Sequence, residues 1–236
     1  MSSNPKPVYL LAGGRPPDRK EQNAMVQAAF RESGKSAPVI GYIGTANGDD
    51  TRFRGFMERE FKGLEILRVD HAIIAPPKAD LDKAKDILRN ADVIFMGGGD
   101  PEEGVRVLRE KRMDEFLRQM YREGKVFYGV SAGSIMLAKK WVRWPDPDDD
   151  ASAELYPCLD IAPVICDTHD EEAGFEELQA AIALEKTGVF GYGLVSNTGI
   201  KVYPDGKVEA IGGAVWQFIK KSGKVIRIED LLPAKL

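Results

Sequence analysis

Cysteine and histidine are both scarce in this sequence. The two cysteines, Cys158 and Cys166, are too few and too irregularly placed for a disulfide framework or a zinc site. They are typical of free thiols in a reducing compartment. Two histidines, with no His/Cys/carboxylate cluster at ligand spacing, give little basis for a metal centre. We therefore expect no metal and no other cofactor.

Long apolar runs and basic blocks are also missing. No stretch of 18 apolar residues occurs, and the first residues, "MSSNPKPVYLLAGG", lack the apolar run of a signal peptide. We therefore expect a soluble, cytoplasmic protein without a membrane partner. A net charge of −4 without a basic cluster argues against nucleic acid as the main partner.

What the sequence does contain is a regular alternation of short apolar runs and amphipathic segments. This β-α alternation is typical of a mostly parallel sheet covered by helices on both faces, a three-layer α/β fold. In such sheets, ligand sites lie beyond the carboxyl ends of the strands. The expected strands are residues 7–13, 37–46, 64–70, 92–100 and 125–130, with a helix capped by Asp80 and a helical region over 101–123.

The second half of the chain has a looser pattern. A Pro/Asp-rich loop is expected after Trp141, then a strand over 161–167 and a helix over 174–186. From Gly191 onward the segments are short and rich in turns, and "PDG" at 204–206 is a hairpin signal. We expect a short antiparallel edge near the C-terminus, and a single domain over residues 1–236.

A candidate nucleophile lies where the fifth expected strand meets a helix. Residues 129–133, "GVSAG", fit the G-x-S-x-G pattern of a nucleophile elbow. Small neighbours let the chain turn tightly and push Ser131 outward, and the positive end of the following helix favours a developing oxyanion. The alternative is a packing turn in which Ser131 only caps the helix. The motif alone does not decide between the two.

A nucleophilic serine needs an adjacent base, and only His71 and His169 are available. His169 follows the expected strand in "APVICDTHD", so it should emerge at a carboxyl end near Ser131. His71 follows the third strand and is equally compatible with an ordinary loop residue. We favour His169 as the base.

The glycine-rich segment "FMGGGDPEE" at 95–103 supplies candidate oxyanion donors. Asp100 is a good helix N-cap, and Pro101 suits the first helical position. Three consecutive glycines exceed what a cap requires, and they let backbone N–H groups approach a substrate closely. The candidate donors are the N–H groups of Gly99 and Ala132. A phosphate loop is not indicated, because the G-x-x-x-x-G-K-[ST] pattern is absent.

In their order and spacing, these motifs resemble the dipeptidase E and cyanophycinase family of serine peptidases. The fold of that family is similar to the class I glutamine amidotransferase domain. The resemblance implies that Ser131 is the nucleophile, His169 the base, and Gly99 and Ala132 the oxyanion donors. It covers roughly residues 6 to 220 and rests on "YIGTA" at 42–46, "GGGDP" at 97–101, "GVSAGS" at 129–134, "CDTHD" at 166–170 and "GLVSNTGI" at 193–200.

The sequence departs from the family pattern where the triad acid should be. The family usually carries its glutamate in a G-x-x-E segment, and here residues 193–196 read "GLVS". A serine hydroxyl can orient His169 but hardly stabilises the imidazolium that forms. Three alternatives remain. Ser196 orients His169 in a Ser-His-Ser arrangement, or catalysis is lost. In the third, a nearby carboxylate takes the place of the acid, and the candidates are Asp146, Asp167 and Asp170.

The resemblance also raises the question of substrate. Family members prefer Asp-X dipeptides or β-aspartyl-arginine links, and such a preference requires a cation near the site. Arg143 is the candidate, although it is equally compatible with an exposed loop arginine. Asp100 stands where dipeptidase E relatives usually have asparagine, and it would disfavour an oxyanion unless it turns away to cap the helix.

Two functions are therefore expected. The first is a serine peptidase that hydrolyses a dipeptide or isopeptide, such as an Asp-containing one, through an acyl-enzyme. The second is a catalytically weak or inactive homologue that binds a peptide or small molecule on the same scaffold, favoured by Ser196. A glutamine amidotransferase is disfavoured, because that chemistry needs cysteine at position 131. The expected partner is a small peptide, and a homodimer is left open.

Overall fold

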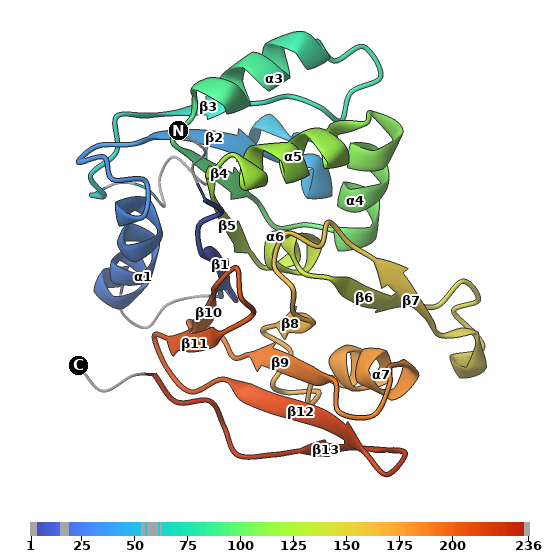
Figure 1. Cartoon of the computed structure of the whole chain (residues 1–236). Helices are drawn as coiled ribbons and strands as arrows, with labels where there is room; N and C mark the ends of the chain where they lie inside the picture. The colour runs from blue at the N-terminus through green and yellow to red at the C-terminus, as the bar shows by residue number, and fades with distance from the viewer. Residues whose placement is uncertain (1–3, 15–18, 53–54, 56–60, 62, 234–236) are drawn as a thin grey trace.

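The computed structural model describes residues 4–14, 19–52, 55, 61 and 63–233, and its centre is a seven-stranded sheet (Figure 1). The strand order is β11-β10-β1-β5-β4-β2-β3. The five strands from β1 to β3 in this order are parallel, and β10 and β11 add an antiparallel edge. The strands are β1 (Val8–Leu11), β2 (Val39–Ile43), β3 (Arg68–His71), β4 (Val93–Met96), β5 (Val126–Val130), β10 (Gly199–Val202) and β11 (Val208–Ile211).

Alternate residues of the central strands point to opposite faces, and both faces are buried. In β4, Val93 and Phe95 belong to one apolar cluster, whereas Ile94 and Met96 belong to another. The first cluster is aromatic, and the rings of Phe95 and Tyr128 stack with centroids 4.4 Å apart. A strand buried on both faces reads as a continuous apolar run, which is why these segments were recognisable in the sequence.

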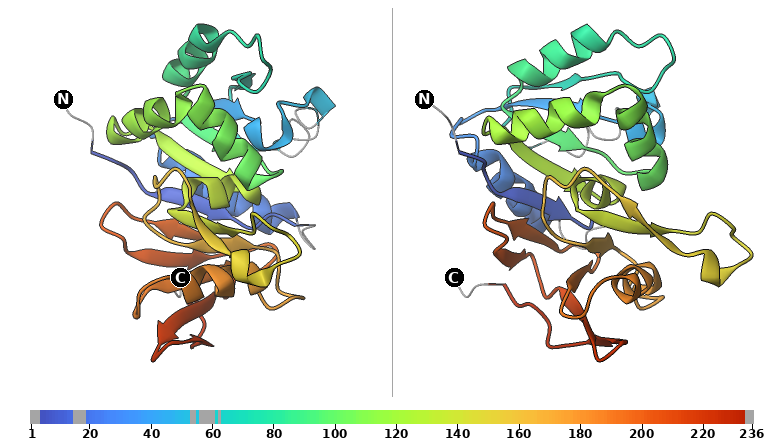
Figure 2. Two further views of the ribbon diagram at one scale, coloured as in Figure 1. Left: turned by 90° about the vertical axis from the view of Figure 1, so that its right-hand side faces the viewer. Right: turned by 45° about the vertical axis from the view of Figure 1, so that its right-hand side comes forward.

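Helices cover both faces of the sheet, as the two turned views show (Figure 2). α1 (Arg19–Arg31) packs on the aromatic face. The opposite face carries α3 (Leu81–Asn90), α4 (Pro101–Glu110), α5 (Met113–Arg122) and α6 (Ala132–Leu137). The expected three-layer α/β class is therefore confirmed. Asp80 caps α3 by accepting the Lys83 N–H at 3.0 Å, as predicted.

The single helical region expected over 101–123 is two helices. The chain breaks at Arg112, whose φ of 55° is left-handed and cannot continue an α-helix. α4 and α5 then pack side by side on the sheet (Figure 1).

A second sheet carries much of the C-terminal part, in the order β13-β12-β9-β8. Its strands are β8 (Cys166–Thr168), β9 (Phe190–Leu194), β12 (Trp216–Lys221) and β13 (Lys224–Arg227), and α7 (Glu176–Leu184) packs on it. The strand expected over 161–167 shrinks to 166–168, because residues 161–164 bond to the end of α6 instead. The "PDG" hairpin prediction is correct, since that turn joins β10 to β11.

The loop expected after Trp141 is also partly wrong. Trp141 lies in β6 (Lys140–Arg143), which pairs antiparallel with β7 (Glu154–Pro157). Two short 3-10 turns complete the described elements, η1 (Thr45–Asn47) and η2 (Asp150–Ser152). Among the described residues, no helix is long and apolar enough to cross a membrane.

Candidate active site

Ser131 stands on a strained turn between β5 and α6. Its φ of 54° and ψ of −127° lie outside the regions that non-glycine residues normally adopt. Two glycines make the turn feasible. A Cβ on Gly129 would lie 2.6 Å from the Gly133 carbonyl carbon, and a Cβ on Gly133 would lie 2.1 Å from the Met96 carbonyl oxygen. The Ser131 side chain makes no capping bond to α6, so the structure does not support the capping role.

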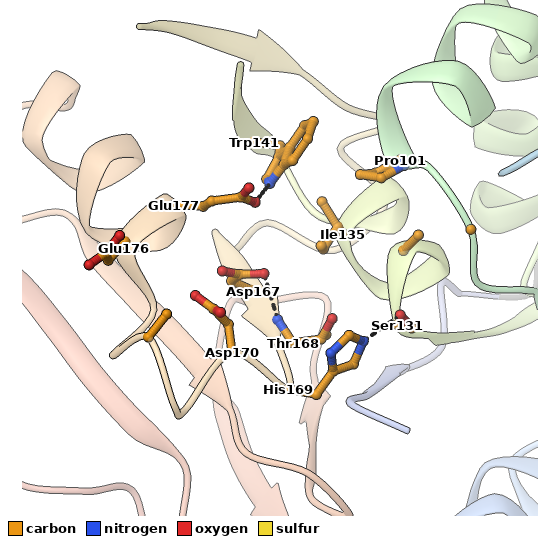
Figure 3. A pocket seen from close by; sticks show the side chains of 13 residues that line it. Pro101, Ser131, Ile135, Trp141, Asp167, Thr168, His169, Asp170, Glu176 and Glu177 are labelled. Atoms are coloured by element: carbon orange, nitrogen blue, oxygen red, sulfur yellow. Dashed lines mark hydrogen bonds between the residues drawn. The ribbon is translucent and has the colours of Figure 1, made fainter. Parts of the chain in front are cut away.

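The Ser131 hydroxyl instead meets His169. The Ser131 Oγ and His169 Nε2 atoms are 2.7 Å apart, a hydrogen-bond distance (Figure 3). His169 follows β8, and its backbone N–H donates to the Leu194 carbonyl of β9 at 2.8 Å. β8 is further tied to α6 by the Cys166 thiol, which donates to the Ser134 carbonyl. Residues 38 positions apart are thus held together by the second sheet.

The other histidine is placed elsewhere. His71 ends β3, the edge strand, and two strands, β2 and β4, separate it from β5. At about 4.8 Å per strand, that distance is far beyond the reach of a side chain. His71 is buried, and its Nε2 lies 2.9 Å from Asp49 Oδ1. It is therefore a structural residue and not an alternative base.

The glycine-rich end of β4 approaches Ser131 closely. A Cβ on Gly98 would lie 3.3 Å from the Ser131 Cβ, and a Cβ on Gly99 would lie 2.0 Å from the Ala46 carbonyl oxygen. Gly99 and Ala132 line the same cavity as Ser131. Over the described part of the chain, neither the Gly99 N–H nor the Ala132 N–H donates a hydrogen bond. Two backbone donors are thus available next to the hydroxyl.

Ser196, where the resemblance predicts the acid of the triad, contacts a glutamate. The Ser196 N–H donates to Glu171 Oε1 at 3.2 Å, while Glu171 Oε2 is buried without a partner among the described residues. Burial opposes ionisation of Glu171, but hydrogen bonds from Ser196 and the charge of His169 outweigh it and lower the pKa of Glu171. Glu171 is not among the carboxylates expected from the sequence. The acidic run "HDEE" after the base was the available signal.

Of the other predicted site residues, Asp167 and Asp170 line the cavity, whereas Asp100, Asp146 and Arg143 are not among its lining residues. Asp100 caps α4 by accepting the Glu103 N–H at 3.1 Å. Asp146 is exposed in the loop after β6. Arg143 pairs with Glu102 at 2.8 Å and Glu154 at 2.6 Å, and it lies over the Tyr156 ring. Both carboxylates compensate its charge, and Arg143 is not among the described residues that line the cavity.

The cavity in front of Ser131 has a volume of about 350 Å³, within the range of small-molecule sites. Its acidic residues are Asp167, Asp170, Glu176 and Glu177. Burial and the charges of Glu177 and Asp170 raise the pKa of Asp167 to about 7, although the Thr168 N–H opposes this. Burial likewise raises the pKa of Glu177, against the bond donated by Trp141. The cavity thus combines a nucleophile–base pair with an acidic wall.

Comparison with known proteins agrees with this geometry. The sequence model of peptidase family S51 matches residues 8–210, most of the chain. The chain belongs to peptidase family S51. This is the dipeptidase E and cyanophycinase family whose motifs the sequence resembles, a family of serine peptidases.

Individual S51 relatives are distant. The uncharacterized peptidase YgaJ of Bacillus subtilis (strain 168) is 26% identical over 130 residues, and the match spans 55% of each chain. A solved peptidase from an acI-B1 Actinobacterium superposes with a TM-score of 0.73 at 13% identity, covering 98% of both chains. A protein provisionally assigned as peptidase E from Listeria monocytogenes EGD-e gives 0.63 at 18% identity, covering 87% of this chain and 98% of its own. At these identities the two structures show the shared fold only.

Proposed function

We propose that this S51 peptidase hydrolyses short peptides, as a dipeptidase or isopeptidase, through an acyl-enzyme on Ser131. The 2.7 Å contact between Ser131 Oγ and His169 Nε2 carries the proposal. It joins a strained, outward-turned hydroxyl to a base at the distance that proton transfer needs. The cavity volume of about 350 Å³ supports a small substrate rather than an extended chain.

The reaction follows from the positions of these groups. His169 Nε2 takes the Ser131 proton while the hydroxyl oxygen attacks the peptide carbonyl carbon. The N–H groups of Gly99 and Ala132 donate to the oxyanion of the tetrahedral intermediate, and the C–N bond breaks as His169 returns the proton to the leaving amine. Water then attacks the ester by the same route, and this step releases the acid product and restores Ser131.

Glu171 is our candidate for the acid of the triad, with Ser196 as its support. By the resemblance, Ser196 stands where the family carries its acid, and its N–H donates to the Glu171 carboxylate. A carboxylate anchored there stabilises the imidazolium of His169, which a serine hydroxyl alone hardly does. The unpartnered Glu171 Oε2 is the oxygen available for this role. Asp146 is a poor substitute because it lies in an exposed loop.

A second candidate function is a binding protein that has lost turnover. Ser196 in place of the family's glutamate is the observation that favours it. The same cavity would then hold a peptide without cleaving it, and the Ser131–His169 contact would be a remnant of the scaffold.

Fluorophosphonate labelling separates the two candidates. We expect the wild-type protein to be labelled, Ser131→Ala to lose the label, and Ser36→Ala, which removes an exposed serine, to retain it. A dipeptide panel followed by amine release should then show turnover that Ser131→Ala abolishes. Labelling that persists in Ser131→Ala contradicts the proposal, and a folded protein that is never labelled supports the binding function.

A further inference from the structure

The wall of the cavity facing Ser131 is strongly acidic. Of the described residues that line the cavity, four are carboxylates and none is lysine or arginine. Figure 3 shows Asp167, Asp170 and Glu177 on the side opposite Ile135 and Ser131. Clefts lined by one sign of charge concentrate ligands of the opposite sign. An acidic substrate side chain would be repelled here.

Asp167, which belongs to this acidic wall, has a carboxylate oxygen without a hydrogen-bond partner. The residue is 4% exposed, and its Oδ1 accepts the Thr168 N–H at 2.7 Å. Its Oδ2 is buried and has no hydrogen-bond partner among the described residues. A buried carboxylate oxygen left unpaired is strongly unfavourable, and a donor brought by a ligand removes the penalty.

Glu177 and Trp141 complete the same wall. Glu177 comes from α7, and its Oε2 accepts the Trp141 indole N–H at 3.1 Å, which fixes both side chains beside the cavity (Figure 3). An indole face next to carboxylates is a favourable environment for an organic cation. The two side chains belong to elements far apart in the sequence, so the arrangement is specific to the fold.

We propose that this wall binds a positively charged group of the peptide substrate, an ammonium or guanidinium, held by Asp167 and Glu177 beside Trp141. The inference rests on the proposed function and names its substrate class. The charge has two potential sources with the same chemistry: the free N-terminal amine of the peptide, or a lysine or arginine side chain.

Binding of such a cation should strengthen as the pH rises through neutrality. The groups that face Asp167 are Glu177 of α7 and Asp170 of the loop after β8. His169 directly precedes Asp170 in the chain. Burial is the largest cause, and together with the charges of Glu177 and Asp170 it raises the pKa of Asp167 to about 7. Below that pH Asp167 is protonated and attracts a cation less, and a bound cation favours the ionised form.

The test measures peptide binding to Ser131→Ala by calorimetry, so that binding is observed without turnover. Four probes separate the two sources of charge: Lys-Ala, N-acetyl-Lys-Ala, norleucyl-Ala and N-acetyl-norleucyl-Ala, with N-acetyl-Asp-Ala as the acidic comparison. We expect at least one charged source to bind about ten-fold tighter than the uncharged probe. N-acetyl-Asp-Ala should bind more weakly than the uncharged probe.

A matched pair of variants assigns the effect to the wall. In the Ser131→Ala background, Asp167→Asn should remove most of the preference for the cationic probe and its rise between pH 6 and 8. Glu172→Gln removes the same charge from an exposed position outside the cavity and should leave both unchanged. Equal binding of charged and uncharged probes, or an intact preference in a folded Asp167→Asn protein, overturns the proposal. Cationic binding without turnover by the wild-type protein would reject only the peptidase.

Discussion

The two histidines of this chain each lie next to carboxylates, and the surroundings differ in how completely those carboxylates are hydrogen-bonded. Asp49, beside His71, also accepts the N–H groups of Gly44, Ile74 and Ala75. Beside His169, Asp167 and Glu171 each keep a buried oxygen without a partner in the described structure. Both oxygens of Asp49 are thus bonded and stabilise the fold, although His71 Nδ1 is itself buried without a partner among the described residues. The carboxylates beside His169 retain unused bonding capacity, which is what a site for chemistry requires.

The largest expected effect separates the two histidines by activity. His169→Ala should lower kcat/KM on the order of 10⁴-fold or more, because the base of the triad is lost. His71→Ala should retain kcat for the folded fraction, because His71 lies two strands away from Ser131's strand. Steady-state assays corrected for folded protein by circular dichroism measure both. Equal losses would mean that the two histidines do not have separate roles.

Stability should show the reverse ranking. Asp49→Asn is expected to lower the free energy of unfolding by about 3–5 kcal/mol, because it breaks a buried network with His71 and three backbone donors. Urea denaturation measures this change. Asp50→Asn, at a half-buried neighbour paired with the exposed Arg52, is the control and should leave the midpoint nearly unchanged.

The pH dependence of that network has a definite sign. Burial opposes ionisation of Asp49, but the bonds from His71, Ala75 and Ile74 outweigh it and lower the pKa of Asp49. A lowered carboxyl pKa contributes stability that is present above the unfolded-state value and is lost as the pH falls through the folded one. The contribution of Asp49 should therefore disappear only in acid, and Asp49→Asn should remove that loss.

A smaller effect of opposite sign is expected at Asp167. Burial, with Glu177 and Asp170, raises the pKa of Asp167 to about 7, so the folded protein binds a proton that the unfolded chain releases near pH 4. The free energy of unfolding should fall as the pH rises from about 4 to 7, by a few kcal/mol at most, and then level off. Asp167→Asn should flatten this decline. A decline that survives in the variant would assign it to other groups.

The smallest expected effect tests which residue is the acid of the triad. Glu171→Gln should lower kcat about 10- to 100-fold with little change in KM, since the imidazolium of His169 loses its compensating charge. Glu172→Gln serves as the control. The double variant Glu171→Gln/Ser196→Glu, which returns a carboxylate to the family's usual position, should recover turnover. No loss in Glu171→Gln would leave Ser196 itself, or Asp170, as the orienting group.

Some features of the fold could be predicted from local sequence and others could not. Buried parallel strands, the Asp80 cap and the nucleophile elbow depend on residues adjacent in the chain, and each was recognisable. The break at Arg112 was not, because a left-handed arginine leaves no glycine or proline signal. The β6–β7 pairing was missed for a similar reason, since the turn-rich segment between the strands reads as a loop.

In the candidate site, likewise, the nucleophile and the base could be predicted from the sequence, but the contacts around them could not. Ser131 and His169 each follow a strand, so topology alone suggested their meeting. Which carboxylate reaches Ser196 depends on the path of the chain after His169, where Gly174 and Phe175 both adopt positive φ. Nothing in the spacing of Asp170, Glu171 and Glu172 distinguishes them. The ion pairs of Arg143 were unpredictable for the same reason, because its two partners come from other elements.

The contact of Gly133 with the Met96 carbonyl has a consequence for how this peptidase can evolve. The turn carrying the hydroxyl and the loop offering its backbone donors are wedged together without room for a methyl group. A mutation that shifts either of these two segments would also displace the other. Variation in rate and selectivity among descendants of this chain should therefore accumulate on the opposite wall, which Asp167, Glu176 and Glu177 help to line.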